Sequence, residues 1–343
     1  MELEDERVPL VLYLRDFANK GVQNNIGKKV IDLIPGWNKV FGFVAIDASL
    51  EDLKEVIEAL EALLEDDKCC ENPAHKAAEI GALKLLQIFL HEGLIDFNTT
   101  SGSNKDTPLH LACKNGRTEI VKLIILASKE RGINLNAKDE LFGQTPFLLA
   151  CYLGNTEIMK LFLDSSEEYD IDLTCSTKST ILLKSALHLA CKQGTIEPVE
   201  LLINSSKRYK IDLNKTDYFG NTAFQEACDN TQFDENIEIV KLMLKSAKEY
   251  GIDINRQDRS VYSSSGHYDD SFHHVISKSN AELAKSMMEN HKEFGLDITR
   301  KNLEGNTGLD LIKEQIETYG RMNFVEVKNM LELDTKSNCC SIL

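Results

Sequence analysis

The sequence predicts an all-α array of stacked helical pairs, and three observations support this fold class. One short phrase, clearest at 107–116 as Thr-Pro-Leu-His-Leu-Ala-Cys-Lys-Asn-Gly, recurs about every 35–40 residues. The copies at 145–154 and 185–194 repeat it closely, and each is followed by a stretch with apolar residues at helical spacing. A period of this length is typical of repeats that pack on their neighbours, rather than of a globule around one core.

The recurring phrase predicts a short first helix. Thr107 is a suitable N-cap, and Pro108 stands at the first helical position, where its missing N–H costs nothing. Leu109 and Ala112 supply an apolar face, and the small alanine lets neighbouring helices approach closely. Gly116 then ends the helix, because glycine adopts the positive φ that is common at a helix C-terminus.

A second helix, an extended stretch and a turn complete each unit. The second helix is predicted at 118–125, and its pattern returns at 155–163 and 236–244. The extended stretch is Ile-Asn-Leu-Asn at 133–136, and Asp-Tyr-Phe-Gly at 217–220 is an example of the turn that follows.

These units resemble the ankyrin repeat, whose signature is Thr-Pro-Leu-His-x-Ala followed by a glycine and a second helix. Six or seven copies, four of them close matches, cover 72–334 and begin near Asn72, Thr107, Thr145, Ser185, Thr222, Asp270 and Thr307. The resemblance implies an all-α ankyrin-repeat solenoid with β-turn tips. The units are longer than the common repeat of about 33 residues, and the excess lies at the end of the second helix, as at 127–131. About four added residues predict one additional helical turn.

We expect an N-terminal helical region over 1–68, ankyrin repeats over 69–334 and a flexible tail over 335–343. In the first region, Ser49 is the predicted cap of a helix whose apolar stripe runs from Leu50 to Leu64. Two interpretations are open for this helix. It covers the apolar end of the first repeat, as the end of an array requires, or it binds a partner; the first is favoured.

Composition excludes several classes of function. The net charge of −16 argues against a nucleic-acid partner, which would require a basic stripe. A membrane-spanning helix is not expected, because the chain has no run of 18 apolar residues. The acidic N-terminus does not resemble a signal peptide, which predicts a cytoplasmic protein. We further expect a monomer that binds protein partners and no cofactor.

Four of the nine cysteines occupy the same place in the recurring phrase, namely Cys113, Cys151, Cys191 and Cys228. Equivalent atoms of packed helices lie roughly 8–10 Å apart, which exceeds the Cα separation of about 7 Å that a disulfide tolerates. We therefore predict that they are small buried residues with free thiols.

Catalysis and metal binding have weak support in the sequence. The cluster of His267, Asp269, Asp270, His273 and His274 contains metal-ligand residue types. However, His273 occupies the histidine position of the phrase, which in ankyrin repeats braces the turn, so we predict no metal. No Ser-His-Asp order, nucleophile elbow or kinase signature is present, which predicts a non-enzymatic chain. The remaining enzymatic alternative is an unrecognised enzyme domain within 1–68 that the array would target.

The resemblance implies a partner-binding concave face lined by the turn tips and the first helices. The corresponding positions are Leu141, Phe142, Tyr218, Phe219 and Leu303 at the tips and Tyr152, Leu153, Lys192, Gln193 and Asp229 on the first helices. Large apolar groups on a rigid surface are typical of interface hot spots. The alternative is that the tip aromatics pack on the neighbouring tip.

The last four residues, Cys340-Ser-Ile-Leu343, resemble a C-a-a-X prenylation signal, and a final leucine favours a geranylgeranyl group. The adjacent Cys339 is a candidate for palmitate, which would provide the second signal that stable anchoring requires. The sequence thus predicts a protein–protein scaffold or adaptor tethered to the cytoplasmic face of a membrane. The alternative is a soluble inhibitor or sequestering subunit of a signalling or transcription factor, similar to the ankyrin proteins that mask Rel-type factors.

Overall fold

The computed structural model describes residues 73–93, 95–177, 183–230, 234–257, 270–302 and 304–340. Within these ranges every regular element is a helix, which confirms the predicted all-α class, and isolated antiparallel bridges close the turns that join the helical pairs. The chain divides into two compact units, 1–150 with 157–172 and 151–156 with 173–343. The predicted helix after Ser49, Cys69 and Cys70 lie outside the described residues.

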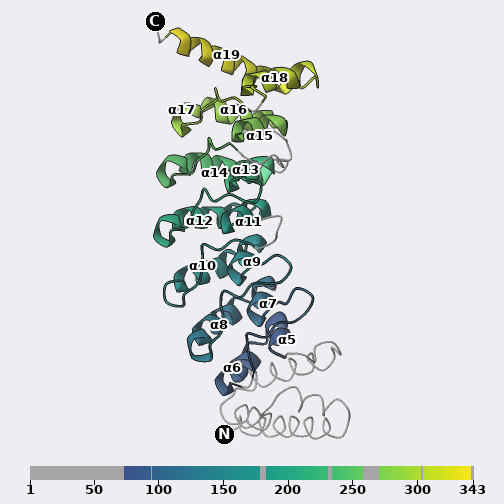
Figure 1. Cartoon of the computed structure of the whole chain (residues 1–343), viewed down its shortest axis with the longest axis vertical. Coiled ribbons are helices and arrows are strands. Elements are labelled where there is room, and N and C mark those ends of the chain that lie inside the picture. The colour runs from purple at the N-terminus through teal and green to yellow at the C-terminus, as the bar shows by residue number, and fades with distance from the viewer. Residues whose placement is uncertain are drawn as a thin grey trace, which may run out of the picture. The chain divides into compact units, whose positions relative to one another are not determined.

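The first unit contains successive helical pairs that lie side by side (Figure 1). First helices pack on first helices and second helices on second helices, as α5 does on α7 and α6 on α8. The elements are α5 (Pro73–Ile80), α6 (Leu83–Glu92), α7 (Pro108–Lys114), α8 (Thr118–Arg131), most of α9 (Pro146–Leu153) and α10 (Thr156–Ser165).

The second unit continues the same arrangement. In it α11 packs on α13, α13 on α15 and α15 on α18, while α12 packs on α14 and α16 on α19. The elements are α11 (Ala186–Gln193), α12 (Ile196–Tyr209), α13 (Ala223–Asp229), α14 (Asp234–Tyr250), α15 (Ser271–Ser277), α16 (Ala281–Glu289), α17 (His291–Phe294), α18 (Gly308–Glu317), the 3-10 turn η2 (Met322–Phe324) and α19 (Val325–Cys340).

Where the phrase has its histidine, this residue joins the first helix to the next repeat. The hydroxyl of Thr107 donates to Nδ1 of His110 at 2.8 Å, and the Thr107 backbone N–H donates to the same atom. Nε2 of His110 then donates to the carbonyl of Gln144, 34 residues further along, at 3.1 Å. Ser185 and His188 repeat this pattern. Because both donors on the cap point at Nδ1, the geometry selects the neutral ring with its proton on Nε2.

Asparagines in the extended stretches form a second link between repeats. The amide of Asn98 donates to the carbonyl of Gly132 at 2.9 Å, and its oxygen accepts from the N–H of Asn134 at 2.7 Å. Asn136, Asn214 and Asn255 make the same pair of bonds to the following repeat. In each case the carbonyl belongs to a residue with positive φ in the segment that leads from the second helix to the next extended stretch. Each asparagine therefore satisfies one backbone carbonyl and one backbone N–H of the loop in the next repeat.

The additional turn of the second helices is present and forms its own layer of contacts. Helices α8 and α12 each have 14 residues and end at Arg131 and Tyr209, respectively. In this turn Lys129 lies 3.9 Å from Glu168 and 4.8 Å from the ring centre of Tyr169. Lys207 makes the equivalent contacts with Glu249 and Tyr250 of the next repeat. The added residues thus extend the interface between second helices.

The C-terminal end differs from the expected tail. Helix α19 continues to Cys340, although 335–343 is predicted to be a flexible segment. The stretch 325–340 contains neither proline nor glycine, so nothing in it interrupts the helix. The cysteines agree with the prediction, since Cys113, Cys151, Cys191 and Cys228 are buried and form no disulfide within the described residues. Burial raises the pKa of Cys113, Cys191 and Cys228 well above the ordinary thiol value, which leaves them unreactive.

Candidate functional site

The tip between α12 and α13 is a rigid turn that exposes an aromatic ring. One carboxylate oxygen of Asp217 accepts from the N–H groups of Phe219 and Asn221, each at 2.9 Å. Burial raises the pKa of Asp217 above its usual value, although these bonds and Lys184 oppose the shift. The turn leaves Tyr218 52% exposed, and Phe219 is partly buried with its ring centre 5.5 Å from that of Tyr218. The two aromatics therefore pack on each other within one tip.

The tip of the first unit has the same construction. Asp139 accepts from the N–H of Phe142 at 2.7 Å, and Leu141 and Phe142 are both exposed. Leu303 lies outside the described residues. Of the five predicted tip positions, three are therefore exposed apolar residues and Phe219 is partly anchored.

The first helices of the second unit contribute a further exposed group. Tyr152 and Leu153 are exposed at the end of α9, and Lys192 is exposed at the equivalent position of α11. Lys192 makes no ion pair with any residue that the structure describes. Gln193 has a packing role, because its side chain covers Gly154 and accepts from the N–H of Thr195 at 2.9 Å.

Asp229 is already engaged within the chain. Its Oδ1 lies 2.8 Å from Nδ1 of His274 and 3.8 Å from Nζ of Lys278. Burial alone would raise the pKa of Asp229, but the bond to His274 and the nearby cations lower it overall. The predicted contact residue is thus an ionised group with internal partners.

A buried charged cluster lies beside it, and sequence reasoning did not identify it. Nζ of Lys184 is 2.5 Å from a carboxylate oxygen of Glu226 and 3.9 Å from one of Asp217, and all three side chains are largely buried. The recurring phrase nevertheless contained a sign of this buried charge. At the position where α7, α9 and α11 have leucine, α13 has Glu226 and α15 has His274.

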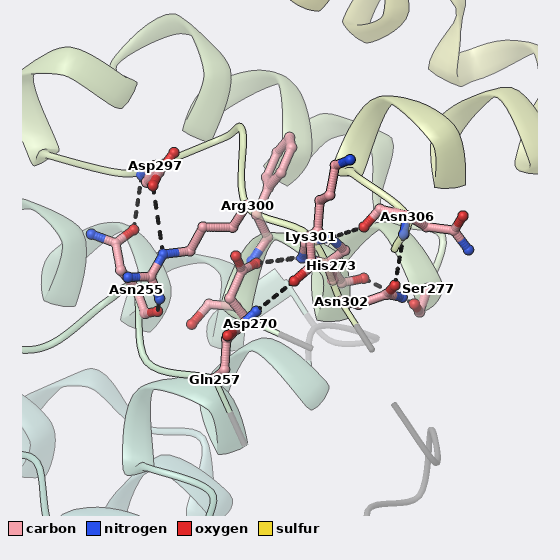
Figure 2. A network of polar contacts seen from close by, with 12 residues as sticks. Asn255, Gln257, Asp270, His273, Ser277, Asp297, Arg300, Lys301, Asn302 and Asn306 are labelled. Atoms are coloured by element: carbon pink, nitrogen blue, oxygen red, sulfur yellow. Dashed lines mark hydrogen bonds and ion pairs between the residues drawn. The ribbon is translucent and has the colours of Figure 1, made fainter. Parts of the chain in front are cut away.

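The predicted histidine–carboxylate cluster is part of the repeat framework (Figure 2). Nδ1 of His273 lies 2.7 Å from Asp270, which caps α15, and Nε2 lies 3.1 Å from the carbonyl of Asn306. Both ring nitrogens therefore face oxygen atoms, and the carboxylate of Asp270 takes the place beside His273 that the hydroxyl of Thr107 has beside His110. His267 and Asp269 lie outside the described residues. In the described part of the chain no group of three metal-ligating side chains occurs.

Family comparison identifies the repeats. A sequence model described as "Ankyrin repeats (3 copies)" matches residues 46–139 and 168–258, and one described as "Ankyrin repeat" matches 142–174. The chain belongs to the ankyrin-repeat family. The ankyrin match begins at 46, ahead of residue 69, where we expected the repeats to start. Ankyrin repeats form protein–protein interaction domains, so the repeat part of this chain is a domain of that kind.

Solved ankyrin structures agree with this fold. The ankyrin repeat domain of Bcl-3, described as a unique member of the IkappaB protein family, is 24% identical with a TM-score of 0.54, over 70% of this chain and 93% of that one. The human ASB11 ankyrin repeat domain is 23% identical with a TM-score of 0.50, over 70% and 91%. These likenesses concern the all-α ankyrin solenoid fold alone. No curated protein sequence matches the chain.

Proposed function

We propose that this ankyrin protein is a non-enzymatic scaffold or adaptor, and that it captures a protein partner on the exposed side chains of its first helices and tips. A lipid on Cys340 would hold it at the cytoplasmic face of a membrane. The observation that carries the proposal is the exposure of Tyr152, Leu153 and Tyr218 on a hydrogen-bonded framework, in which Tyr218 also contacts Phe219 of its own tip. Aromatic residues held in this way bind with little loss of conformational entropy.

The charges of the second unit favour a particular kind of partner. Its inner carboxylates are occupied, Glu226 by Lys184 and Asp229 by His274 and Lys278. The exposed Lys192 therefore supplies the available charge beside Tyr152 and Leu153. A partner segment with apolar and acidic side chains complements this surface, even though the chain as a whole is acidic.

The tether rests on the terminal sequence Cys340-Ser-Ile-Leu343 and on the neighbouring Cys339. Metabolic labelling with a prenyl analogue tests it directly. We expect label on the intact chain and none on the Cys340→Ser variant, with Cys339→Ser retaining the prenyl label. Absence of label on the intact chain would contradict the anchor and favour the soluble inhibitor or sequestering subunit.

Partner capture is tested with the variant carrying Tyr152→Ser and Tyr218→Ser. We expect its affinity for a captured partner to fall by at least about tenfold, because aromatic anchors dominate interface energies. Tyr250→Ser is the matched control, since this tyrosine lies on the second-helix side against Lys207. Equal binding by all three proteins would refute the assigned surface. The thermal melting profile of the variant carrying Tyr152→Ser and Tyr218→Ser should change little.

A further inference from the structure

We infer that Leu183 is a further contact residue for the captured partner, and that Leu183 and Tyr218 together receive apolar side chains of one extended partner segment. The inference deepens the proposed function and rests on it. Leu183 belongs to the tip before α11, and its side chain is 42% exposed. It stands outside the recurring turn pattern of 217–220, so the tip positions predicted from the sequence do not include it.

Leu183 occupies a position where the turn requires a positive φ. This position lies two residues before the threonine or serine that opens the phrase, which here is Ser185. In the other tips that the structure describes at this place, φ lies between 52° and 85°, at Lys105, Gly143, Gly220 and Gly305. Leu183 has φ 37°. A bulky side chain rarely adopts such a backbone, and glycine would adopt it without strain.

Hydrogen bonds, rather than the leucine side chain, hold the base of this tip. The N–H of Lys184 donates to the hydroxyl of Thr177 at 2.9 Å, and the N–H of Thr177 donates to the carbonyl of Lys184 at 3.0 Å. Three other tips close with glycine at the position of Leu183, so the turn itself needs no side chain there. Strained residues are concentrated at binding sites. The strain and the exposure of Leu183 therefore indicate contact with another molecule.

The tip that carries Leu183 lies beside the tip that carries Tyr218. Helix α11 packs on α13, and Nζ of Lys184 lies 3.9 Å from a carboxylate oxygen of Asp217. Asp217 in turn accepts from the N–H of Phe219 in the turn that exposes Tyr218. Packed helices are roughly 8–10 Å apart, and alternate side chains of an extended segment are about 7 Å apart. Two alternate residues of one partner segment can therefore reach both tips.

The charges beside these two tips already have partners within the chain. Lys184 faces both Glu226 and Asp217 in the buried cluster. An ionised partner group at this place would compete with these pairs, whereas an apolar side chain leaves them intact. The exposed Lys192 stands near the other end of α11, about 10 Å further along the axis. The partner that fits thus places alternate apolar residues over the tips and acidic residues toward Lys192.

A displayed library of random peptides about 12 residues long, which span about 40 Å when extended, supplies the probe. Peptides are selected on the full chain and counter-selected against the variant carrying Tyr152→Ser and Tyr218→Ser. Fluorescence anisotropy then measures the affinity of a selected peptide. We expect Leu183→Gly to weaken its binding roughly five- to tenfold, because apolar contact surface is lost. Leu183→Met should bind like the parent, because methionine retains that surface.

Lys210→Gly is the matched control. Lys210 also has a positive φ, at 55°, but it lies at the end of α12 on the second-helix side. This change should leave the affinity for the peptide unaltered. The urea midpoint of Leu183→Gly should stay close to that of the parent, since glycine accepts the positive φ without strain.

The possible failures are distinguishable. If no peptide survives the counter-selection, the proposed surface is wrong and this inference fails with it. Selected peptides that bind the Leu183→Gly variant as tightly as the parent would overturn the inference alone. Weaker binding together with a marked fall in the urea midpoint of that variant would show a structural role for Leu183, and would also overturn the inference.

Discussion

Nε2 of His188 donates to the carbonyl of Asn221 at 2.9 Å, across 33 residues of sequence. The bond links the start of α11 to the residue before the cap of α13, and protonation of Nδ1 would remove the acceptor that the N–H and hydroxyl of Ser185 share. Burial lowers the pKa of His188 to about 4, and the bond to Asn221 offsets only part of this.

The first prediction concerns pH. The unfolded His188 protonates near pH 6.5 and the folded one near 4, so the unfolded state binds more protons in that window. The contribution of neutral His188 to the free energy of unfolding is fully present above pH 6.5. It is lost as the pH falls toward 4, by an amount on the order of 3 kcal/mol. Urea unfolding at pH 7.5, 6 and 5 measures it. His188→Gln should reduce the pH dependence, because Gln225 makes the same link to the carbonyl of Arg256. An equally steep decline in that variant would contradict the assignment.

The asparagine links predict a specific loss of stability. Asn214→Ala removes bonds to the carbonyl of Gly251 and the N–H of Asp253, each 2.7 Å long. We expect the free energy of unfolding to fall by about 2 kcal/mol in urea titration. Asn329→Ala, at an exposed position of α19, should change it by less than about 0.5 kcal/mol. Similar losses in the two variants would show that the link contributes little.

The buried cluster predicts that removing its cation alone costs more stability than removing the cation together with one of its carboxylates. Lys184→Met leaves the carboxylates of Glu226 and Asp217 without their shared cation, and we expect a loss of about 3–5 kcal/mol. Adding Glu226→Gln to Lys184→Met should recover part of that stability, since it removes one uncompensated charge. Chemical unfolding of the single and double variants tests the coupling. Strictly additive losses would contradict it.

Gly154 predicts a steric effect. Its φ is 70°, and a Cβ atom there would lie 2.8 Å from Cδ of Gln193. Gly154→Ala should therefore destabilise more than Gly102→Ala, where φ is 73° but no atom lies within 4 Å. We expect the former to lose up to about 1 kcal/mol more in thermal or urea unfolding, because the crowding atoms lie at the end of the flexible Gln193 side chain. Equal losses would mean that backbone conformation alone determines both.

Much of the repeat architecture could be predicted from the sequence, because the sequence of a typical unit contains its own helix cap, apolar face and terminating glycine. Thr107 and Pro108 predict the start of α7 from local chemistry alone. The links made by Asn98 and Asn214 could not be predicted in this way, because their partners lie some 36 residues away in the next unit. The same reason hid the engagement of Asp229 by His274. Exposure of Tyr218 was predicted from its place at a tip, whereas the partial burial of Phe219 depends on its contact with that ring.

Photo-crosslinking from position 218 tests the central claim most directly. With a photoreactive phenylalanine derivative in place of Tyr218, the account predicts a covalent adduct with the captured protein. The same derivative in place of Tyr250, on the second-helix side, should give no such adduct. Capture of the partner with adducts only from position 250, or with equal adducts from both positions, would contradict binding through the first helices and tips.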